Sequence, residues 1–468
     1  MTSEVMIGIE THVQLNTKSK MFCSDPSDQK DAEPNSNTCP ICLGMPGSKP
    51  KVNKVAVKYG VLVGLALNCS INKRVFFSRK AYFYPDLSKN FQITQYEVPI
   101  AVNGKVQLGT NTIRIRRVHI EEDPAKLIYS GGDITNSKGV LIDYNRAGVP
   151  LAEIVTEPDF KSPKEVRSFL ERLSSILEYL GVYDSTREMS LRVDANISIN
   201  GGERVEVKNI TGFENVEKAL SYEIVRQNGL ARMNVSVQRE TRHFDAEMRT
   251  TKSLRKKEYE DDYGYIFDPD LPMVNLGEDY VLNIKSSMPE LPEQMARRFE
   301  AEYNINEYYA GVIVYAGKDM AKFFEDTVKL HNNPQIVANW LINYVLKSLN
   351  WRSERISNSK IRPDSFAEFL DMIKNGEITE RYAKELIKKY VDTGESPKSL
   401  ISGGAKKVDK SELIKIVASI IDSNSEAVAQ FRSGRLEALQ FLIGQVLNKT
   451  QKQADPKEIK EIIESSLK

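Results

Sequence analysis

The strongest constraint on the fold is a change in the spacing of apolar residues partway along the chain. Before residue 288 many segments alternate apolar and polar residues with a period of two, which indicates strands with one buried face. The clearest of these are residues 7–15 and 191–199. After a turn at 200–203 the alternation resumes at Val205, and this pattern predicts a hairpin.

Before residue 288 two segments look helical, 54–67 and 162–180, and Ser162 and Pro163 are typical of a helix start. From Pro289 onward it dominates, at 291–303, 335–349 and 365–373. Residues 393–408 are rich in Gly, Ser, Pro and Lys, which is typical of a linker. A chain of 468 residues is too long for one compact core. We therefore predict an α+β fold with a β-rich domain at 1–290, a helical domain at 291–395 and a small α-helical tail at 396–468.

Composition excludes some classes of protein. No run of about 18 apolar residues is present, so we expect no membrane span, and residues 1–15 lack the pattern of a secretory signal. Lys and Arg number 65 against 64 Asp and Glu, so bulk charge neither supports nor excludes nucleic-acid binding. Four cysteines in a chain of this length do not form a disulfide framework. We expect a cytoplasmic protein.

Glu10 and His12 are the first candidate site residues. Residues two apart on a strand project from the same face, so this carboxylate and imidazole can share a metal ion or act as an acid–base pair. A solvated polar strand face remains the alternative.

Further acidic residues occur in the segment 119–123 and at Glu153, which has apolar neighbours, and Asp194 lies among arginines. Several segments of acids and bases suit Mg²⁺ and phosphate. Solvated charges at the edges of the strands explain the same residues equally well.

Two other segments contain candidate binding residues whose role the sequence does not decide. The basic and aromatic run 79–86 includes Lys80 and Tyr82 and suits either phosphate and base stacking or an amphipathic strand. Cys23, Cys39 and Cys42 have the spacing of a zinc knuckle but are only three thiols. Phosphate-binding loops of the common kinds and the nucleophile elbow are absent from the sequence, so any ATP site is of an uncommon kind.

Taken together, long segments of the chain resemble one family. The segments are IGIETHVQL, CPICLGMPGSKP, FSRKAYFYPDLSKNFQITQ, HIEEDPAKL, DYNRAGVPLAEIVTEPD, SLRVDANISI, EVKNITGFENVEKAL, FDPDLP and FRSGRLEALQFLIGQVLNKT. In this order they resemble the GatB family, whose members belong to the aspartyl/glutamyl-tRNA(Asn/Gln) amidotransferases. The resemblance spans almost the whole chain.

The resemblance implies an ATP-dependent and Mg²⁺-dependent enzyme that phosphorylates the side-chain carboxylate of mischarged Asp-tRNA(Asn) or Glu-tRNA(Gln). Ammonia then displaces the phosphate, and it comes through a tunnel from a separate amidase (glutaminase) subunit, in a complex that also contains a small third subunit. The implied fold is a cradle-shaped catalytic domain, a helical domain, and a tail domain that contacts the tRNA body. Whether Asp-tRNA, Glu-tRNA or both are substrates is left open.

The resemblance also assigns residues. It implies that the Mg²⁺ ligands and catalytic groups are Glu10, His12, Glu122 and Glu153, with Asp194 as a further ligand. We expect Lys80 and Tyr82 at the phosphate or acceptor end of the site. The residues expected to hold the ATP phosphates are Arg192, Arg204 and Lys208.

One departure from the family concerns zinc. Many members carry a second cysteine soon after the first, whereas Ser24 and Asp25 follow Cys23 here, which puts a tightly bound structural Zn²⁺ in doubt. The alternative to a catalytic role is a tRNA-binding scaffold in the same kind of complex, without chemistry of its own.

Overall fold

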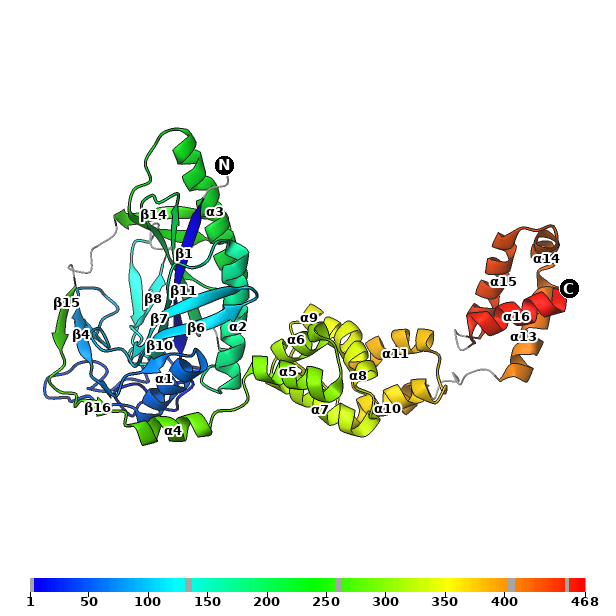
Figure 1. Cartoon of the computed structure of the whole chain (residues 1–468), viewed down its shortest axis with the longest axis horizontal. Helices are drawn as coiled ribbons and strands as arrows, with labels where there is room; N and C mark the ends of the chain where they lie inside the picture. Colours follow the sequence, from blue (N-terminus) through cyan, green and yellow to red (C-terminus); the bar gives the residue numbers. More distant parts are fainter. Residues whose placement is uncertain are drawn as a thin grey trace. The chain divides into compact units, whose positions relative to one another are not determined.

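A computed structural model describes residues 4–130, 137–187, 189–256, 263–401, 409–450 and 454–467. The chain divides into two compact units, Met1–Leu291 and Pro292–Lys468 (Figure 1). The first unit contains all the strands of the described part of the chain, and the second is helical. This is the α+β organisation expected from the change in apolar spacing.

The first unit is built on a nine-stranded sheet in the order β14-β13-β12-β11-β1-β10-β7-β6-β2. Its strands are β1 (Val5–Gln14), β2 (Ser70–Ile71), β6 (Ala101–Leu108), β7 (Asn111–Glu122), β10 (Pro150–Thr156), β11 (Leu191–Ile199), β12 (Val205–Ile210), β13 (Glu240–Asp245) and β14 (Thr250–Lys256). Neighbouring strands are antiparallel, except that β12 and β13 are parallel. The predicted hairpin is β11–β12, and its turn begins at Asn200 and Gly201, whose φ angles of 52° and 70° suit these residue types.

One face of this sheet is apolar and lies under three helices, α1 (Lys54–Ala66), α2 (Pro163–Tyr179) and α3 (Phe213–Arg232). Ile7, Ile9 and Val13 of β1 are at most 1% exposed in the core beneath them. Burying side chains of this size stabilises the fold by about 1.5–3 kcal/mol each. Asn53 and Ser162 cap α1 and α2 by accepting hydrogen bonds from their first turns.

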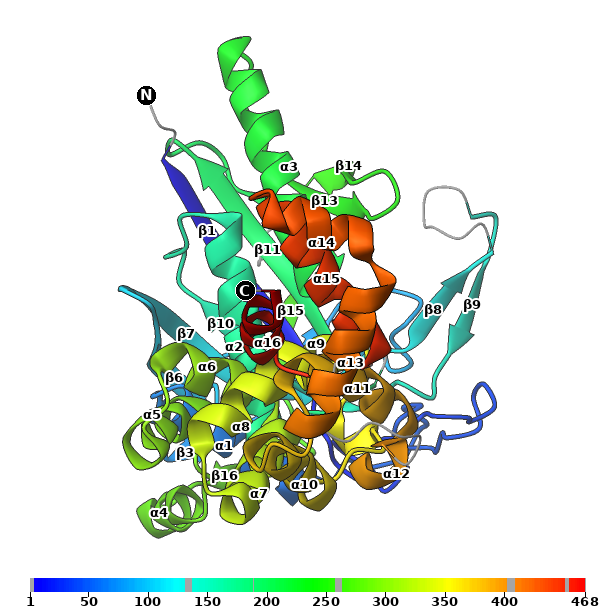
Figure 2. The ribbon, with the colours of Figure 1, turned by 90° about the vertical axis from the view of Figure 1, so that its right-hand side faces the viewer.

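Smaller sheets complete the first unit. They are β15 (Gly264–Phe267), β4 (Ser78–Ala81) and β5 (Phe91–Thr94) in that order, β16 (Val274–Asn275) with β3 (Arg74–Val75), and β8 (Lys126–Tyr129) with β9 (Val140–Asp143), followed by helix α4 (Glu278–Ser286). In Figure 1, β4 and β15 lie on the opposite side of the large sheet from α2 and α3. The β8–β9 hairpin projects from the unit (Figure 2). The three-stranded sheet is therefore a second wall on the side of the large sheet that the helices leave open.

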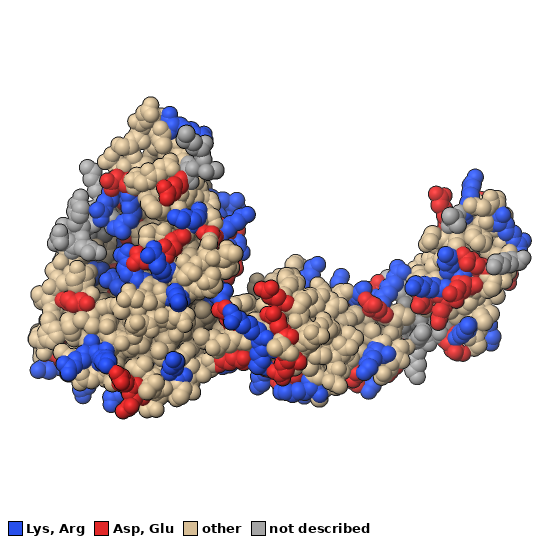
Figure 3. Space-filling view, viewed as in Figure 1, with Lys and Arg blue, Asp and Glu red and all other residues tan. Residues whose placement is uncertain are grey.

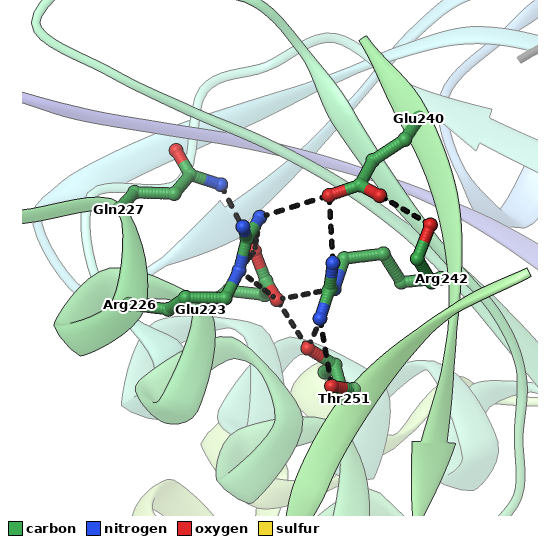
Figure 4. Close-up of polar contacts among 7 residues, drawn as sticks. Glu223, Arg226, Gln227, Glu240, Arg242 and Thr251 are labelled. Atoms are coloured by element: carbon green, nitrogen blue, oxygen red, sulfur yellow. Dashed lines mark hydrogen bonds and ion pairs between the residues drawn. The ribbon is translucent and has the colours of Figure 1, made fainter. Parts of the chain in front are cut away.

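A buried ionic network attaches α3 to β13 and to the edge strand β14. Figure 4 shows the fully buried carboxylate of Glu223 between the guanidinium groups of Arg226 and Arg242. The closest contacts are 2.8 Å to Arg226 Nη2 and 3.1 Å to Arg242 Nε, and Gln227 and Thr251 also donate to this carboxylate. Burial alone would raise the pKa of Glu223, but these donors lower it below its usual range.

The second unit begins with helices that cover residues 292–401. They are α5 (Pro292–Tyr303), α6 (Glu307–Tyr315), α7 (Lys318–His331), α8 (Pro334–Trp340), a π-helical turn (Leu341–Leu346), α9 (Lys347–Trp351), a 3₁₀ turn (Ile356–Asn358), α10 (Pro363–Lys374), α11 (Glu380–Thr393) and α12 (Pro397–Ile401). The expected linker at 393–408 is thus partly wrong, because α12 forms where Pro397 and Ile401 are buried. Residues 402–408 lie outside the described residues.

The last helices have their own core. They are α13 (Lys410–Ser423), α14 (Ser425–Arg432), α15 (Leu436–Lys449) and α16 (Pro456–Leu467). Leu413, Val417, Leu442, Val446 and Ile459 are completely buried in it. Among the helices of the described residues, none is long and apolar enough to cross a membrane.

Candidate active site on the polar face of the large sheet

Ionisable side chains gather on the face of the large sheet that the helices do not cover. His12 of β1 lies opposite Glu153 of β10, and Glu10 lies opposite Asp194 of β11. Strand β10 in turn places Glu153 opposite His119 of β7. Directly paired residues project from the same face, so the strand register brings together groups that are far apart in the sequence.

Glu153 lies between two imidazoles. Its Oε2 is 3.3 Å from His12 Nε2 and 3.2 Å from His119 Nε2, and His119 Nε2 is also 3.6 Å from Glu121 Oε2. Burial alone would lower the pKa of both histidines, but the charge of Glu153 raises each to about 9. Burial would raise the pKa of Glu153, and the two histidines instead hold it well below its usual range. Without a metal ion, this group is therefore a carboxylate between two imidazolium ions near neutral pH.

On the other side of Glu10 the site is acidic. Lys208 Nζ lies 3.2 Å from Asp194 Oδ2 and 3.5 Å from Glu206 Oε1, and the carboxylates raise its pKa. Burial alone would raise the pKa of Asp194, but Lys208 and other neighbours lower it. Glu10 itself accepts a hydrogen bond from Asn196 Nδ2 at 3.1 Å. Burial and the nearby carboxylates raise the pKa of Glu10, so its charge is only partly compensated.

Three overlapping groups of side chains on this face could each hold one cation. Within each group the ligand atoms all lie within 4.8 Å of one another. The groups are Glu10 with His12 and Glu153, His119 with Glu121 and Glu153, and Glu10 with Asp194 and Glu206. They share Glu10 and Glu153, so they form one continuous row, which we call the acid row. His12 Nε2 is buried and, although it lies 3.3 Å from Glu153 Oε2, makes no hydrogen bond with a described residue. A buried, unsatisfied nitrogen beside carboxylates fits a divalent cation.

Glu122 does not join the acid row. Adjacent residues of a strand point to opposite faces, and Glu122 instead contacts Lys89 Nζ at 2.5 and 2.7 Å and accepts from the backbone N–H of Ile93. Its neighbour Glu121, which the sequence analysis did not select, is the member of this segment that faces Glu153. The alternation of His119 and Glu121 with buried Val118 and Ile120 is the signal that could have identified it. A role for Glu122 as a ligand stays a prediction.

Arg192 also pairs with a carboxylate outside the acid row. Its Nη2 lies 2.8 Å from Oδ1 of Asp123. Gln14 donates to the same buried carboxylate, and Arg146 lies 3.7 Å from it. Burial alone would raise the pKa of Asp123, and the two arginines lower it. Arg192 therefore forms the wall of the site beyond His12.

A cavity of about 170 Å³ opens at the Glu10 end of the acid row. Its lining includes Gly8, Ser198 and two arginines, Arg116 and Arg204. Arg116 is paired with Glu157 at 2.8 Å, whereas Arg204 makes no ion pair with any described residue. The cavity thus combines an arginine that has no ion pair among the described residues with Glu10 of the acid row.

Lys80 and Tyr82 lie at the other wall, in and just after β4. Burial and the charges of Asp86 and Glu121 raise the pKa of Tyr82, and Lys208 lowers it, so this side chain faces the acid row. The ammonium of Lys80 lies 5.8 Å from the ring centroid of Tyr82. Both residues belong to the second wall of the site.

The three cysteines predicted as zinc ligands are close together. Ligand atoms of Cys23, Asp25, Cys39 and Cys42 all lie within 4.8 Å of one another, and Cys42 Sγ is 3.3 Å from Asp25 Oδ2. A hydrogen bond from Cys23 and the nearby Lys20 ammonium lower the pKa of Cys42 to about 6. Three thiols and one carboxylate fit the donor types and number of a tetrahedral zinc site.

The chain matches two family models, one described as the GatB/GatE catalytic domain over residues 5–282 and one described as the GatB domain over residues 322–467. Curated relatives are similar over their full lengths. The chain is 45% identical to the GatB subunit of the aspartyl/glutamyl-tRNA(Asn/Gln) amidotransferase of Saccharolobus solfataricus, with 99% of each chain covered. Identity to the proteins of the same name from Methanospirillum hungatei and Thermotoga maritima is 43% and 42%, over 99% of this chain and 98% of theirs. The chain therefore belongs to the GatB family of aspartyl/glutamyl-tRNA amidotransferase subunits.

Proposed function

We propose that this chain is the catalytic subunit of a tRNA-dependent amidotransferase that uses ATP and Mg²⁺. Its substrate would be Asp-tRNA(Asn), Glu-tRNA(Gln) or both, and its product the corresponding Asn-tRNA or Gln-tRNA. The observation that carries the proposal is the acid row between an arginine-lined cavity and a wall that holds Lys80 and Tyr82. Acids and imidazoles of this kind, next to cations, suit phosphoryl transfer.

The reaction needs two steps because a carboxylate resists attack by ammonia. In the first step the side-chain carboxylate of the aminoacyl group takes the γ-phosphoryl group of ATP, and ADP leaves. In the second, ammonia attacks the acyl carbon and phosphate leaves, which forms the amide. Mg²⁺, when bound, offsets the negative charge of the transferring phosphoryl group.

The residues of the chain have separate tasks in this proposal. Glu10, His12 and Glu153 would hold the metal ion, and Asp194 would act as a further ligand at the Glu10 end of the row. Glu206 and Asp194 keep the Lys208 ammonium beside Glu10, where it can attract phosphate oxygens.

Arg204 is the strongest candidate for the phosphates of ATP. It lines the cavity beside Glu10 and has no carboxylate partner among the described residues. Arg192 is a weaker candidate, because Asp123 already compensates its charge. The phosphates would then lie at one end of the acid row, with the acceptor carboxylate approaching from the other.

Partners and a second metal ion belong to the same proposal. The chain has no hydrolase motif of the common kinds, so ammonia would come from a separate amidase (glutaminase) protein, which would form a cytoplasmic complex with this chain and a small third protein. Basic and acidic residues are interspersed on the face in Figure 3, so tRNA binding on that face would depend on local groups. Cys23, Cys39, Cys42 and Asp25 would hold a structural Zn²⁺.

The proposal is tested by Glu153→Gln in the assembled complex. The variant should stop amide formation on both mischarged tRNAs, assayed side by side, while glutaminase activity survives. Glu171→Gln, a change at an exposed carboxylate of α2, is the control and should be fully active. Normal amide formation by Glu153→Gln would contradict the assignment. A wild-type chain that binds tRNA but not Mg²⁺ and ATP would favour the scaffold alternative.

A further inference from the structure

A group of tyrosine rings lies beside the acid row, on the three-stranded sheet and the loops next to it. We call it the tyrosine cluster, and its members are Tyr82, Tyr96, Tyr263 and Tyr265. The rings of Tyr96 and Tyr265 are stacked with centroids 3.8 Å apart. Tyr263 meets Tyr82 edge-on at 5.5 Å and Tyr265 at 6.4 Å. All four side chains are half-buried, so the cluster is not part of the closed core.

The cation beside the tyrosine cluster is Lys80, which forms no ion pair with a described residue. Lys80 Nζ lies 4.7 Å from the ring centroid of Tyr263 and 5.8 Å from that of Tyr82. Within the described part of the chain no carboxylate pairs with it, although Lys80 is itself half-buried. Ring faces attract an ammonium ion, but they do not neutralise its charge. An ammonium held in this way is ready to bind a phosphate or another anion.

An exposed aromatic side chain follows the cluster directly. Phe83, the residue after Tyr82, is 90% exposed. A phenylalanine this exposed gains nothing from the core, and next to stacked tyrosines it extends the aromatic surface. Stacked aromatic rings with an adjacent cation are the usual way in which proteins bind unpaired nucleotides without reading their sequence.

We propose that the tyrosine cluster and Lys80 bind an adenosine nucleotide by stacking its base and pairing its phosphate, and that this nucleotide is the unpaired 3′-terminal adenosine of the aminoacylated tRNA. This inference rests on the proposed function, because the aminoacyl group is carried by that adenosine. The adenine of ATP has the same chemistry and is the alternative source.

The position of the cluster favours the tRNA. The arginine-lined cavity opens beside Glu10 on the large sheet, whereas Tyr82 follows β4 on the second wall that faces this sheet. Phosphoryl transfer needs its two reactants to approach the reacting phosphorus from roughly opposite sides. If ATP phosphates occupy the cavity, the acceptor carboxylate enters from the side of the tyrosine cluster. Stacking of the terminal base would hold the ester-linked amino acid at that entrance.

The test is a double-mutant cycle between the ring of Tyr263 and the terminal adenosine. Binding of uncharged tRNA, either complete or lacking its 3′-terminal adenosine, is measured with the assembled complex. For the wild type we expect removal of the adenosine to weaken binding about tenfold. In Tyr263→Leu this ratio should fall close to one, whereas Tyr263→Phe should keep it. Tyr280→Leu, at a partly exposed tyrosine of α4, is the control and should behave as wild type.

A second variant and a second substrate complete the test. Lys80→Met keeps the packing of the stem and removes the charge, so it should reduce the slope of log affinity against log salt by about one.

Amide formation then gives the KM for ATP, which we expect to be unchanged in Tyr263→Leu. A raised KM for ATP with an unchanged tRNA ratio would assign the cluster to ATP instead of tRNA. No change in either would overturn the proposal and leave the tyrosines as packing. If the wild type makes no amide but the cycle shows coupling, the proposed function fails while adenosine binding stands.

Discussion

Glu10→Gln should make the metal-free protein more stable while it removes the response to Mg²⁺. The carboxylate of Glu10 lies within 4.8 Å of ligand atoms of Asp194 and Glu206, and of Glu153 in the neighbouring group. Burial and these three carboxylates raise the pKa of Glu10. The folded state therefore disfavours the ionised form of Glu10, and a glutamine of the same shape removes this unfavourable charge. The amide oxygen of glutamine can still accept the hydrogen bond from Asn196.

The size of the effect follows from Coulomb's law. Two unit charges 4.8 Å apart, the largest separation within each group, interact by about 3–4 kcal/mol at an effective dielectric constant of about 20. The three carboxylates repel Glu10, and Lys208 offsets part of this repulsion. We expect a net stabilisation of about 1–2 kcal/mol, the usual yield of removing one unfavourable group from a functional site. For a domain of this size that is an increase in Tm of about 2–8 °C.

The assay is thermal unfolding of the full chain, followed by circular dichroism in EDTA and in excess MgCl₂. In EDTA the variant should melt above the wild type. MgCl₂ should raise the Tm of the wild type and leave that of the variant unchanged. Glu203→Gln, at an exposed carboxylate in the β11–β12 turn, should match the wild type in both conditions. A variant that melts below the wild type in EDTA, or that keeps its response to Mg²⁺, would refute the reasoning.

Three more predictions concern other parts of the molecule. Glu223→Gln leaves two arginines without their buried carboxylate and should lower the free energy of unfolding, measured in urea, by about 3–5 kcal/mol. Glu214→Gln, at an exposed position on the same helix, is the control and should not change the urea midpoint. Equal midpoints for the two variants would show that the network is not stabilising. His12 and His119 have folded pKa values of about 9, above the unfolded value of about 6.5, so in EDTA their contribution to stability is full below about pH 6.5 and is lost as the pH rises through 9. A flat Tm between these pH values would contradict the pairing with the central carboxylate. Asp25→Cys supplies a fourth thiol, so the variant should keep its Zn²⁺ during a dialysis against EDTA that removes Zn²⁺ from the wild type. Metal analysis after dialysis measures the zinc content of both proteins. Equal zinc contents would count against a metal site at these residues.

The elements that local rules determine were predictable from the sequence. The alternation at 7–15 identified β1, and Ser162 marked the start of α2 as a residue type that caps a helix. Periodicity depends on neighbours a few residues away, so a sequence contains all the information that these elements need. The short helix Pro397–Ile401 was missed because its Gly-rich and Ser-rich surroundings resemble a linker, and burial decided the outcome.

The two adjacent acids Glu121 and Glu122 show a choice that the residues of one segment do not decide. The family resemblance pointed to Glu122, and strand geometry puts Glu121 on the face of the acid row instead. Lys89 and the backbone N–H of Ile93 instead bind the carboxylate of Glu122. Nothing local to the segment 119–123 specifies these partners, since they lie in other parts of the chain.

The sequence by itself determined the types of chemistry available: carboxylates and imidazoles on alternating strands, a cluster of thiols, and a helical C-terminal part. Only the tertiary structure decided which of these groups meet. Glu10 and His12 came into one site with Glu153, His119 and Asp194 because the register of β1 against β10 and β11 aligns them. That register is set by the packing of the apolar face under the helices, and a shift of β1 by one residue would turn Glu10 and His12 into the core.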